Sequence, residues 1–491
     1  MSRTDFFELD RPEYIVSPEL YQVVLAWDIV GKKPVEDKSI GYVFRRDLVT
    51  TDPKKVKIRR MSPLDKPYEE KKRLYNHIIP ENSNNYGNRQ VIGDAIFSSI
   101  EGIKSSKSVS QCSVPINSYS SLLQDIRGVT GKDRPANLSK IINTMFDLGG
   151  EPYDYTASEL WWKNITSDES QEWLQWIENS LSAENINNDF SLKKLISECD
   201  DKSLYQNIGC PLWMASINEG TPFSWFREAW TRLCSDEWYR GLPRRRWNDW
   251  ASCVLRTAVG LGYLWEMHFY TRLVEGLVID GANPVDIVRN ATTTSVGLLS
   301  WSTESTISSR DVSSYIIQIT NQGTSARNMI NSLVKEDIFP SMNEEKYTSS
   351  DNGLVEWVQD CSNHISKEIK KRLSETKGKG KVSGAKNTGE TIRYALLCRD
   401  PFGINADYYG LLNKRGSRYT VVEPSSEWIV VISSLLSRKP NETVRMEDVV
   451  RSLISLGLKP DYNTLVHELE KAGLTRRSHD ADEALEIATG F

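Results

Sequence analysis

The sequence predicts a mainly α-helical protein with minor β structure, in which a tryptophan-rich central helical domain precedes a C-terminal winged-helix-like domain. Apolar residues recur at three- and four-residue steps along several long segments, which is typical of amphipathic helices. Eleven of the fifteen tryptophans fall between Trp161 and Trp265. The final segment has the pattern of three short helices followed by a hairpin, which is the order of a winged helix.

The length and composition allow several globular domains. At roughly 100–200 residues per domain, the 491 residues are enough for about three. Hydrophobic residues make up 39% of the chain and charged residues 26%, which is the balance of a globular protein. The predicted parts are a mixed α/β N-terminal region (1–135), a tryptophan-rich helical domain (136–345), a helix (346–376), a basic flexible linker (377–390) and a winged-helix-like domain (391–491).

The N-terminal region combines several kinds of signal. Apolar spacing predicts a short helix over residues 14–30 with Ser17 as its cap, and residues 40–50 favour a strand. Residues 67–79 are typical of a charged helix. The stretch 82–133 is rich in Ser, Asn and Gly, which indicates loops and short elements.

The clearest helix is predicted over residues 247–278, where apolar side chains recur at helical spacing. Gly260 and Gly262 fall inside it, and such glycines mark either a kink or a close helix crossing. The tryptophans around this helix admit two interpretations, a platform on which nucleic-acid bases stack or a bulky helical core. Their helical offsets favour the core.

The C-terminal part begins after a predicted helix at 352–374. A stretch rich in Gly, Lys and Ser follows this helix and is the predicted domain boundary, so we expect residues 391–491 to fold on their own. Residues 418–422 favour a strand. Three helices are predicted over 428–436, within 443–457 and over 461–472, and hairpin strands over 474–478 and 483–487.

The sequence carries none of the common catalytic or cofactor motifs. It lacks the Gly-x4-Gly-Lys-Ser/Thr phosphate loop, the His-Glu-x-x-His zinc motif and the Gly-x-Ser-x-Gly nucleophile elbow. The Lys/Gly stretch that starts at Lys377 is predicted to lack the strand and the helix that a phosphate loop needs. The seven cysteines form no Cys-x-x-Cys pair, so we predict no metal and no cofactor. Acids such as Asp154, Glu159 and Asp249 leave a metal-dependent nuclease site open as an alternative.

The chain has no segment typical of membrane insertion or secretion. No run approaches the roughly 18 consecutive apolar residues of a membrane helix. The N-terminus lacks the apolar region of a secretory signal, and the scattered cysteines fit a reducing compartment. We therefore expect a cytoplasmic protein with no membrane contact.

Nucleic-acid binding would have to come from local basic groups, since the net charge of the whole chain is −5. The segment 366–420 holds thirteen lysines and arginines against five acids. Three arginines also precede the long helix, where the helix dipole does not favour positive charge. The candidate phosphate contacts are Arg244, Arg245, Arg246, Lys377, Lys379, Lys381, Lys386, Arg476 and Arg477. Arg244, Arg245 and Arg246 are explained equally well as a solvated turn, and the lysines from Lys377 to Lys386 as a solubilising linker.

The predicted third helix of the winged-helix-like domain is a poor groove reader by charge. Residues 461–472 carry three acids and one lysine, and we expect this helix to pack on a partner or on the rest of the chain instead. Arg476 and Arg477 stand where a wing would start.

Residues 242–256, with three consecutive arginines and two tryptophans, and the helix that follows them resemble proteins of bacterial anti-phage defence islands. In particular, they resemble an accessory component of the methylation-associated defence system. The resemblance extends to the tail at 444–487 and includes no catalytic motif. It implies action in a complex with a DNA methyltransferase and other subunits, such as an ATPase.

These observations lead to one hypothesis and two alternatives. The hypothesis is a non-catalytic, DNA-associated scaffold or adaptor subunit of a multi-protein bacterial defence system. The alternatives are an enzyme of the nuclease type with an unrecognised site and an adaptor that binds proteins alone. Binding of DNA without cleavage would separate the hypothesis from both.

Overall fold

The computed structural model describes most of the helical part of the chain. Described are residues 6–12, 18–30, 46–50, 56–60, 91–92, 95, 114–121, 137–166, 174–175, 203, 205, 209–217, 220–295, 297–377, 381–399, 406–476 and 485–491. Within these residues helices predominate, and three small antiparallel sheets contain the strands. The prediction of a mainly α protein with minor β structure is confirmed. None of the described helices has both the length and the apolar character that a membrane span requires.

Several predicted elements lie outside the described residues. They are the charged helix at 67–79, most of the stretch 82–133, Ser17, Trp173 and Trp176. The described part of the predicted strand at 40–50 is β1 (Arg46–Thr50), which pairs antiparallel with β2 (Val56–Arg60).

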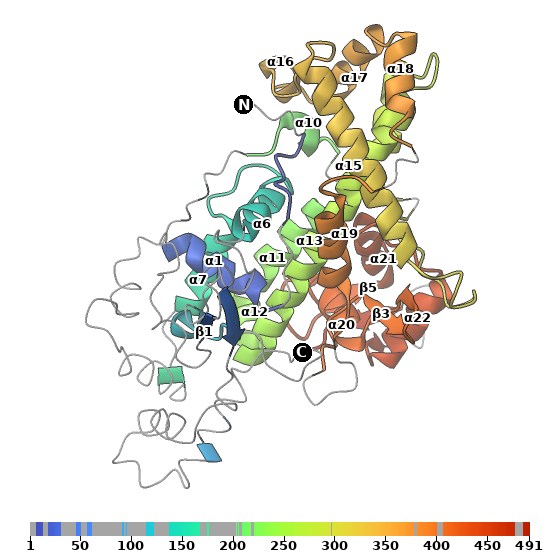
Figure 1. The fold of residues 1–491 in the computed structure, drawn as a ribbon. Coiled ribbons are helices and arrows are strands. Elements are labelled where there is room, and N and C mark those ends of the chain that lie inside the picture. The colour runs from blue at the N-terminus through green and yellow to red at the C-terminus, as the bar shows by residue number, and fades with distance from the viewer. Residues whose placement is uncertain are drawn as a thin grey trace.

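The long helix α13 (Arg244–Leu277) runs through the centre of the fold, as Figure 1 shows. Its 34 residues make it roughly 50 Å long. Side chains on all its faces are buried because other helices pack around it. These are chiefly α11 (Pro222–Leu233), α14 (Pro284–Thr292), α15 (Ser313–Lys335) and α19 (Ala385–Leu396). The helix predicted at 247–278 is thus confirmed.

The N-terminal helices pack on one another, and α1 and α6 also pack on α13. They are α1 (Leu20–Val30), α6 (Leu138–Asp147) and α7 (Ala157–Thr166), with the short α4 (Ser118–Ser121) beside them. Gln22 satisfies buried polar groups here. Its Nε2 donates to Asn248 O at 2.8 Å and to Ser252 Oγ at 2.6 Å, and its Oε1 accepts from Trp161 Nε1 at 3.0 Å. One amide therefore ties three helices together.

All thirteen tryptophans that the structure describes are buried. Several also donate their indole N–H to backbone carbonyls across the core, including Trp230 to Ala157 at 3.0 Å and Trp247 to Leu233 at 2.8 Å. A base-stacking platform needs exposed ring faces. The interpretation of the described tryptophans as core is confirmed.

The prediction of a single helix over residues 352–374 is wrong. The chain forms two helices, α17 (Gly353–Asn363) and α18 (Lys367–Ser374). The Ser366 side chain accepts a hydrogen bond from Ile369 N and so caps a new helix start. Both helices belong to a group near the end of α15 that also contains α10 (Leu212–Ala215) and α16 (Glu345–Thr348).

The segment predicted as a flexible linker at 377–390 is helical from Ala385 onward, where α19 begins. This helix packs closely on α13, since a Cβ on Gly260 would lie 2.6 Å from Leu396 Cγ. Glycine at 260 therefore permits a close helix crossing, and α13 continues through it as one helix. Of the two interpretations of the glycines, the structure supports the close crossing.

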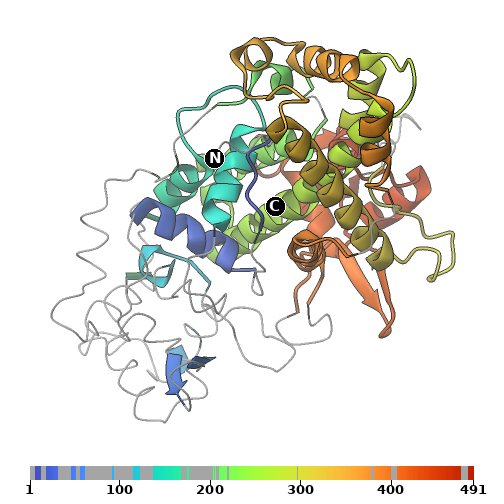
Figure 2. The ribbon, with the colours of Figure 1, turned by 45° about the horizontal axis from the view of Figure 1, so that its top comes forward.

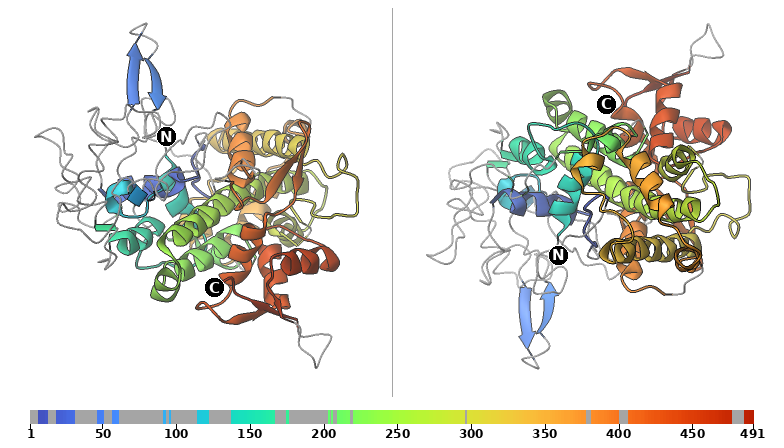
Figure 3. Two further views of the ribbon diagram at one scale, coloured as in Figure 1. Left: turned by 90° about the horizontal axis from the view of Figure 1, so that it is seen from below. Right: turned by 90° about the horizontal axis from the view of Figure 1, so that it is seen from above.

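The C-terminal elements gather on one flank of the helical body, in red in Figure 3. A hairpin of β3 (Leu412–Arg415) and β4 (Tyr419–Val422) comes first and projects from the body in Figure 2. Then follow α20 (Ser426–Ser434), β5 (Thr443–Arg445), α21 (Met446–Ser455), α22 (Tyr462–Lys471), β6 (Thr475–Arg476) and β7 (Glu486–Ala488). The three helices agree with the prediction. Strand β5, inside the range that was expected to hold the second helix, was missed.

The three short strands form a sheet in the order β5-β7-β6. Val444 is opposite Ile487, and Ile487 is opposite Thr475. A single hydrophobic core extends from Phe6 to Ile487 and includes residues on both sides of the predicted boundary at 390. That boundary falls inside α19, so a cut there would divide a helix.

Candidate nucleic-acid interface

Helix α22 is held in place by its N-cap and by its apolar inner face. Asp461 Oδ1 accepts a hydrogen bond from Thr464 N at 2.8 Å, and its Oδ2 accepts one from Thr464 Oγ1 at 2.6 Å. These bonds hold the pKa of Asp461 below its usual range. Leu465 and Leu469 are buried, and the helix contacts α20.

The outer face of α22 is less acidic than its sequence suggests. Asp461 is used as the cap, and Glu468 is 7% exposed with its carboxylate 3.5 Å from Lys471 Nζ. Of the three acids in 461–472, Glu470 alone is exposed. The outer face therefore presents Tyr462, Asn463, His467, Glu470 and Lys471. The sequence-based expectation that α22 does not enter a DNA groove rested on its three acidic residues. Because only one of them is exposed, that argument no longer applies.

Basic side chains stand at both ends of this face. Lys459 is exposed in the turn before α22, and Arg476 is exposed on β6. Within the part of the chain that the structure describes, no carboxylate lies within 4 Å of either cation. Both are therefore available to an external anion. Sequence reasoning missed Lys459, because one lysine in a turn carries no pattern of its own.

A loop before α15 braces the turn between α21 and α22. Leu298 N donates to Gly457 O at 2.6 Å, and the hydroxyls of Thr303 and Thr464 share a hydrogen bond at 3.2 Å. These contacts fix the start of α22 against the helical body. The outer face of α22 is thus presented from a rigid support.

The three arginines at the start of α13 make contacts within the chain. The Arg244 guanidinium is buried and lies 3.8 Å from the ring centroid of Tyr239, and burial lowers its pKa to about 9. Arg245 Nε lies 3.1 Å from Asp249 Oδ1. Arg246 Nη1 donates to Glu427 Oε2 at 2.7 Å, which joins α13 to α20. Their role as phosphate contacts stays a prediction.

The predicted basic residues after α18 do not join the C-terminal ones. Lys377 Nζ lies 3.0 Å from Glu275 Oε1. Lys386 is in the first turn of α19, and Lys381 is exposed just before it. Helix α19 runs from this point back toward β3, so its start points away from α22. Outside the described residues lie Lys379 and Arg477.

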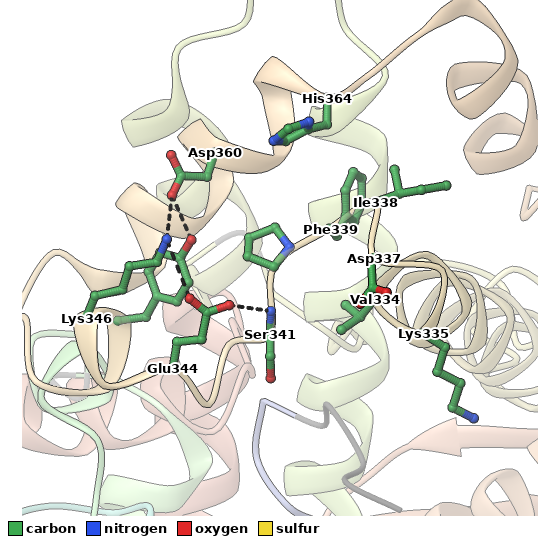
Figure 4. Close-up of a pocket in the computed structure, with 12 residues that line it drawn as sticks. Val334, Lys335, Asp337, Ile338, Phe339, Ser341, Glu344, Lys346, Asp360 and His364 are labelled. Atoms are coloured by element: carbon green, nitrogen blue, oxygen red, sulfur yellow. Dashed lines mark hydrogen bonds and ion pairs between the residues drawn. The ribbon is translucent and has the colours of Figure 1, made fainter.

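A cavity of about 670 Å³ lies beside α16 and α17 (Figure 4). Asp360 accepts hydrogen bonds from Tyr347 OH at 2.7 Å and from Lys346 Nζ at 3.2 Å. The bond from Tyr347 holds the pKa of Asp360 below its usual range, and burial raises the pKa of Tyr347 to about 12. Neither group is poised for proton transfer near neutral pH, so the cluster has the character of a structural ion-pair network.

The acids considered for a nuclease site are separately engaged. Glu159 accepts hydrogen bonds from Thr156 N at 2.7 Å and Ser203 N at 3.3 Å, and Asp249 pairs with Arg245. Asp154 is exposed in the loop before α7. In the described ranges, no cluster of three or more His, Cys, Asp or Glu side chains could hold a metal ion.

No protein-family model and no curated protein matches the sequence.

Proposed function

We propose that this chain is a non-catalytic, DNA-associated adaptor subunit of a multi-protein bacterial defence system, with a winged helix at its C-terminus. The observation that carries the proposal is the arrangement of the terminal elements. Their order is helix, strand, helix, helix, strand, strand, and the sheet order is β5-β7-β6. This order of elements supports a winged helix, and in this proposal its third helix, α22, lies in the major groove of DNA.

The exposed side chains suit such a docking. Asn463 and His467 are one turn apart on the outer face of α22, and amide and imidazole groups can hydrogen-bond base edges or phosphates. Lys459 and Arg476 stand at the two ends of the face, where a winged helix meets the DNA backbone. In this account the backbone contacts supply affinity, and α22 supplies any sequence preference.

The adaptor role rests on the rest of the chain. The resemblance at 242–256 and 444–487 suggests partners such as a DNA methyltransferase or an ATPase. Helix α20 links these two segments, since its Glu427 binds Arg246 of α13 and the helix packs on α21 and α22. A partner on the helical body would thereby be held at a fixed position relative to the DNA.

The proposal is tested by incubating the protein with a fluorescent duplex in the presence of Mg²⁺, with and without chelator. Anisotropy reports binding, and gel electrophoresis reports cleavage. Binding without cleavage supports the proposal. Cleavage that the chelator abolishes would establish a nuclease, and no binding at low salt would leave an adaptor for proteins alone.

A further inference from the structure

A second cavity, of about 470 Å³, lies between α15, the start of α19 and the N-terminal segment 6–12. Its lining is rich in hydroxyl, amide and cationic groups and contains no carboxylate among the described residues. The lining includes Arg11, Arg327, Lys335, Gly384 and Thr388. The cavity is separate from the outer face of α22.

Three cations surround this cavity. Arg327 Nη1 lies 3.2 Å from the buried carboxylate of Glu266, so its charge is partly balanced from behind. Arg11 and Lys335 are exposed, and no described carboxylate lies within 4 Å of either. In Figure 4 the Lys335 side chain points away from Asp360 and Glu344 of the neighbouring cavity. The three cations and one carboxylate leave a net positive site.

The N-terminus of the twelve-residue helix α19 borders the same cavity. No side chain caps α19. Ala385 N donates to Val382 O at 3.2 Å, and no described group accepts a hydrogen bond from the N–H groups of Lys386 and Asn387, so these and the positive end of the helix dipole are open to an anion. Gly384, the residue before the helix, has φ = +99°, and the Arg11 guanidinium lies beside it, 3.8 Å from where a Cβ would stand. The sequence predicted that the Lys/Gly stretch from Lys377 lacks the helix of a phosphate loop. Because α19 begins at Ala385, that part of the prediction is wrong.

The Thr388 side chain is a second, independent feature of this cavity. Thr388 is 6% exposed and lines the cavity, and its hydroxyl makes no hydrogen bond with any described residue. Its oxygen is not closed off from the cavity, so the hydroxyl is available to donate to a ligand there.

We infer that this cavity binds a phosphate group. A phosphate oxygen accepts hydrogen bonds from a helix N-terminus, from a hydroxyl and from lysine or arginine, which are the groups assembled here. The volume exceeds the needs of a bare anion and leaves room for an organic part, which the amides of Asn328 and Asn331 could contact. The phosphate can belong to a small ligand, such as a nucleotide, or to a nucleic-acid backbone.

Calorimetric titration of the full-length protein with inorganic phosphate and with adenosine monophosphate, in phosphate-free buffer, tests this inference. Binding should be detected and should raise the melting temperature. Lys335→Ala and Arg11→Ala should each weaken binding about tenfold through the loss of one charge-assisted contact. Thr388→Val should weaken it about threefold. Lys371→Ala is the matched control, because Lys371 is exposed on α18 and lies outside the cavity.

Competition with a short DNA duplex separates the two sources of phosphate. If Lys335→Ala weakens binding of the small ligands and leaves duplex affinity unchanged, the site takes a free phosphorylated ligand. If Lys335→Ala weakens duplex binding, the site takes a phosphate of the DNA backbone. That outcome rests on the proposed function. Absence of binding by phosphate and by the monophosphate, together with unchanged duplex affinity, would overturn the inference. Equal weakening by Lys371→Ala would do the same.

Discussion

The guanidinium of Arg256 and the carboxylate of Asp407 form a fully buried ion pair, with Nη1 2.9 Å from Oδ2 and side chains 1% and 0% exposed. Arg256 also donates to Ala395 O through Nε and to Leu397 O through Nη2, both at 2.9 Å. One side chain of α13 thus holds the last carbonyls of α19 and the segment that leads to β3. The ion pair is thus a buried polar link between the helical body and the segment that leads to the C-terminal elements.

Removing either partner of this pair should destabilise the protein strongly. Arg256→Met or Asp407→Asn leaves an uncompensated buried polar group, and each should lower the free energy of unfolding by about 3–5 kcal/mol. Urea denaturation followed by tryptophan fluorescence measures this change. Arg451→Ala, which breaks the exposed pair with Glu447, serves as control and should cost at most about 1 kcal/mol. Similar midpoints for Arg256→Met and the parent would contradict the assignment.

The buried tryptophans of α13 give a second stability prediction. Trp265 stacks on Phe269 with ring centroids 5.6 Å apart and donates Nε1 to Thr292 O at 3.1 Å, and Trp250 lies against Trp238 at 5.4 Å. Replacing Trp250 or Trp265 with Ala should cost about 3–5 kcal/mol through loss of burial and the cavity left behind. Thermal melting checks it. If both variants melt within a degree of the parent, the core assignment fails.

His268 should make stability depend on pH. Burial lowers its pKa to about 3, and the nearby charge of Arg272 acts in the same direction. An unfolded histidine titrates near 6.5, so below that pH the unfolded chain binds a proton that the folded chain does not. Above pH 6.5, His268 therefore makes its full contribution to the free energy of unfolding. This stability is lost as the pH falls, at up to roughly 1.4 kcal/mol per pH unit.

The matched variant for this prediction is His268→Gln, which removes the titrating ring. The free energy of unfolding, measured from about pH 7 to 4, should fall less steeply for the variant than for the parent. Parallel curves for the two proteins would show that the imidazole is not shielded from protonation in the folded state.

The C-terminal fragment 391–491 should not unfold cooperatively when it is made alone. The cut divides α19 and removes the partners of Trp428 and Glu427, which bind Thr257 Oγ1 at 3.0 Å and Arg246 Nη1 at 2.7 Å. The packing thus argues against the independent folding that the sequence suggested. Calorimetry of the fragment and the full chain makes the comparison. A sharp, reversible transition of the fragment would restore the sequence-based boundary.

Much of the helical core could be predicted because its signal is local. The periodicity of α13 identified the helix, and the spacing of the tryptophans identified the core. The boundary after α18 could not be predicted, since composition resembles that of a linker while the deciding contact, Gly260 against Leu396, joins residues far apart in sequence. Strand β5 was missed because three residues become a strand only through pairing with β7.

The candidate interface shows the same division. Arg476 was named as a candidate from its place in the expected wing. The exposed charge of α22 was misjudged, because a sequence does not show which acidic side chains cap a helix or pack inward. Glu468 turns inward, and Asp461 binds Thr464. The arginines at 244–246 stood out as a run, yet the structure engages each of them with a different group of the chain.

The most direct test of the account is the salt dependence of duplex binding by the parent and by a Lys459→Ala/Arg476→Ala double variant. Each phosphate neutralised contributes about −0.9 to the slope of log K against log salt, so the double variant should lose roughly 1.8 units of slope. Lys371→Ala should keep the parent slope. An unchanged slope in the double variant, or no duplex binding by the parent at low salt, would contradict the proposal that the C-terminal elements contact DNA as a winged helix.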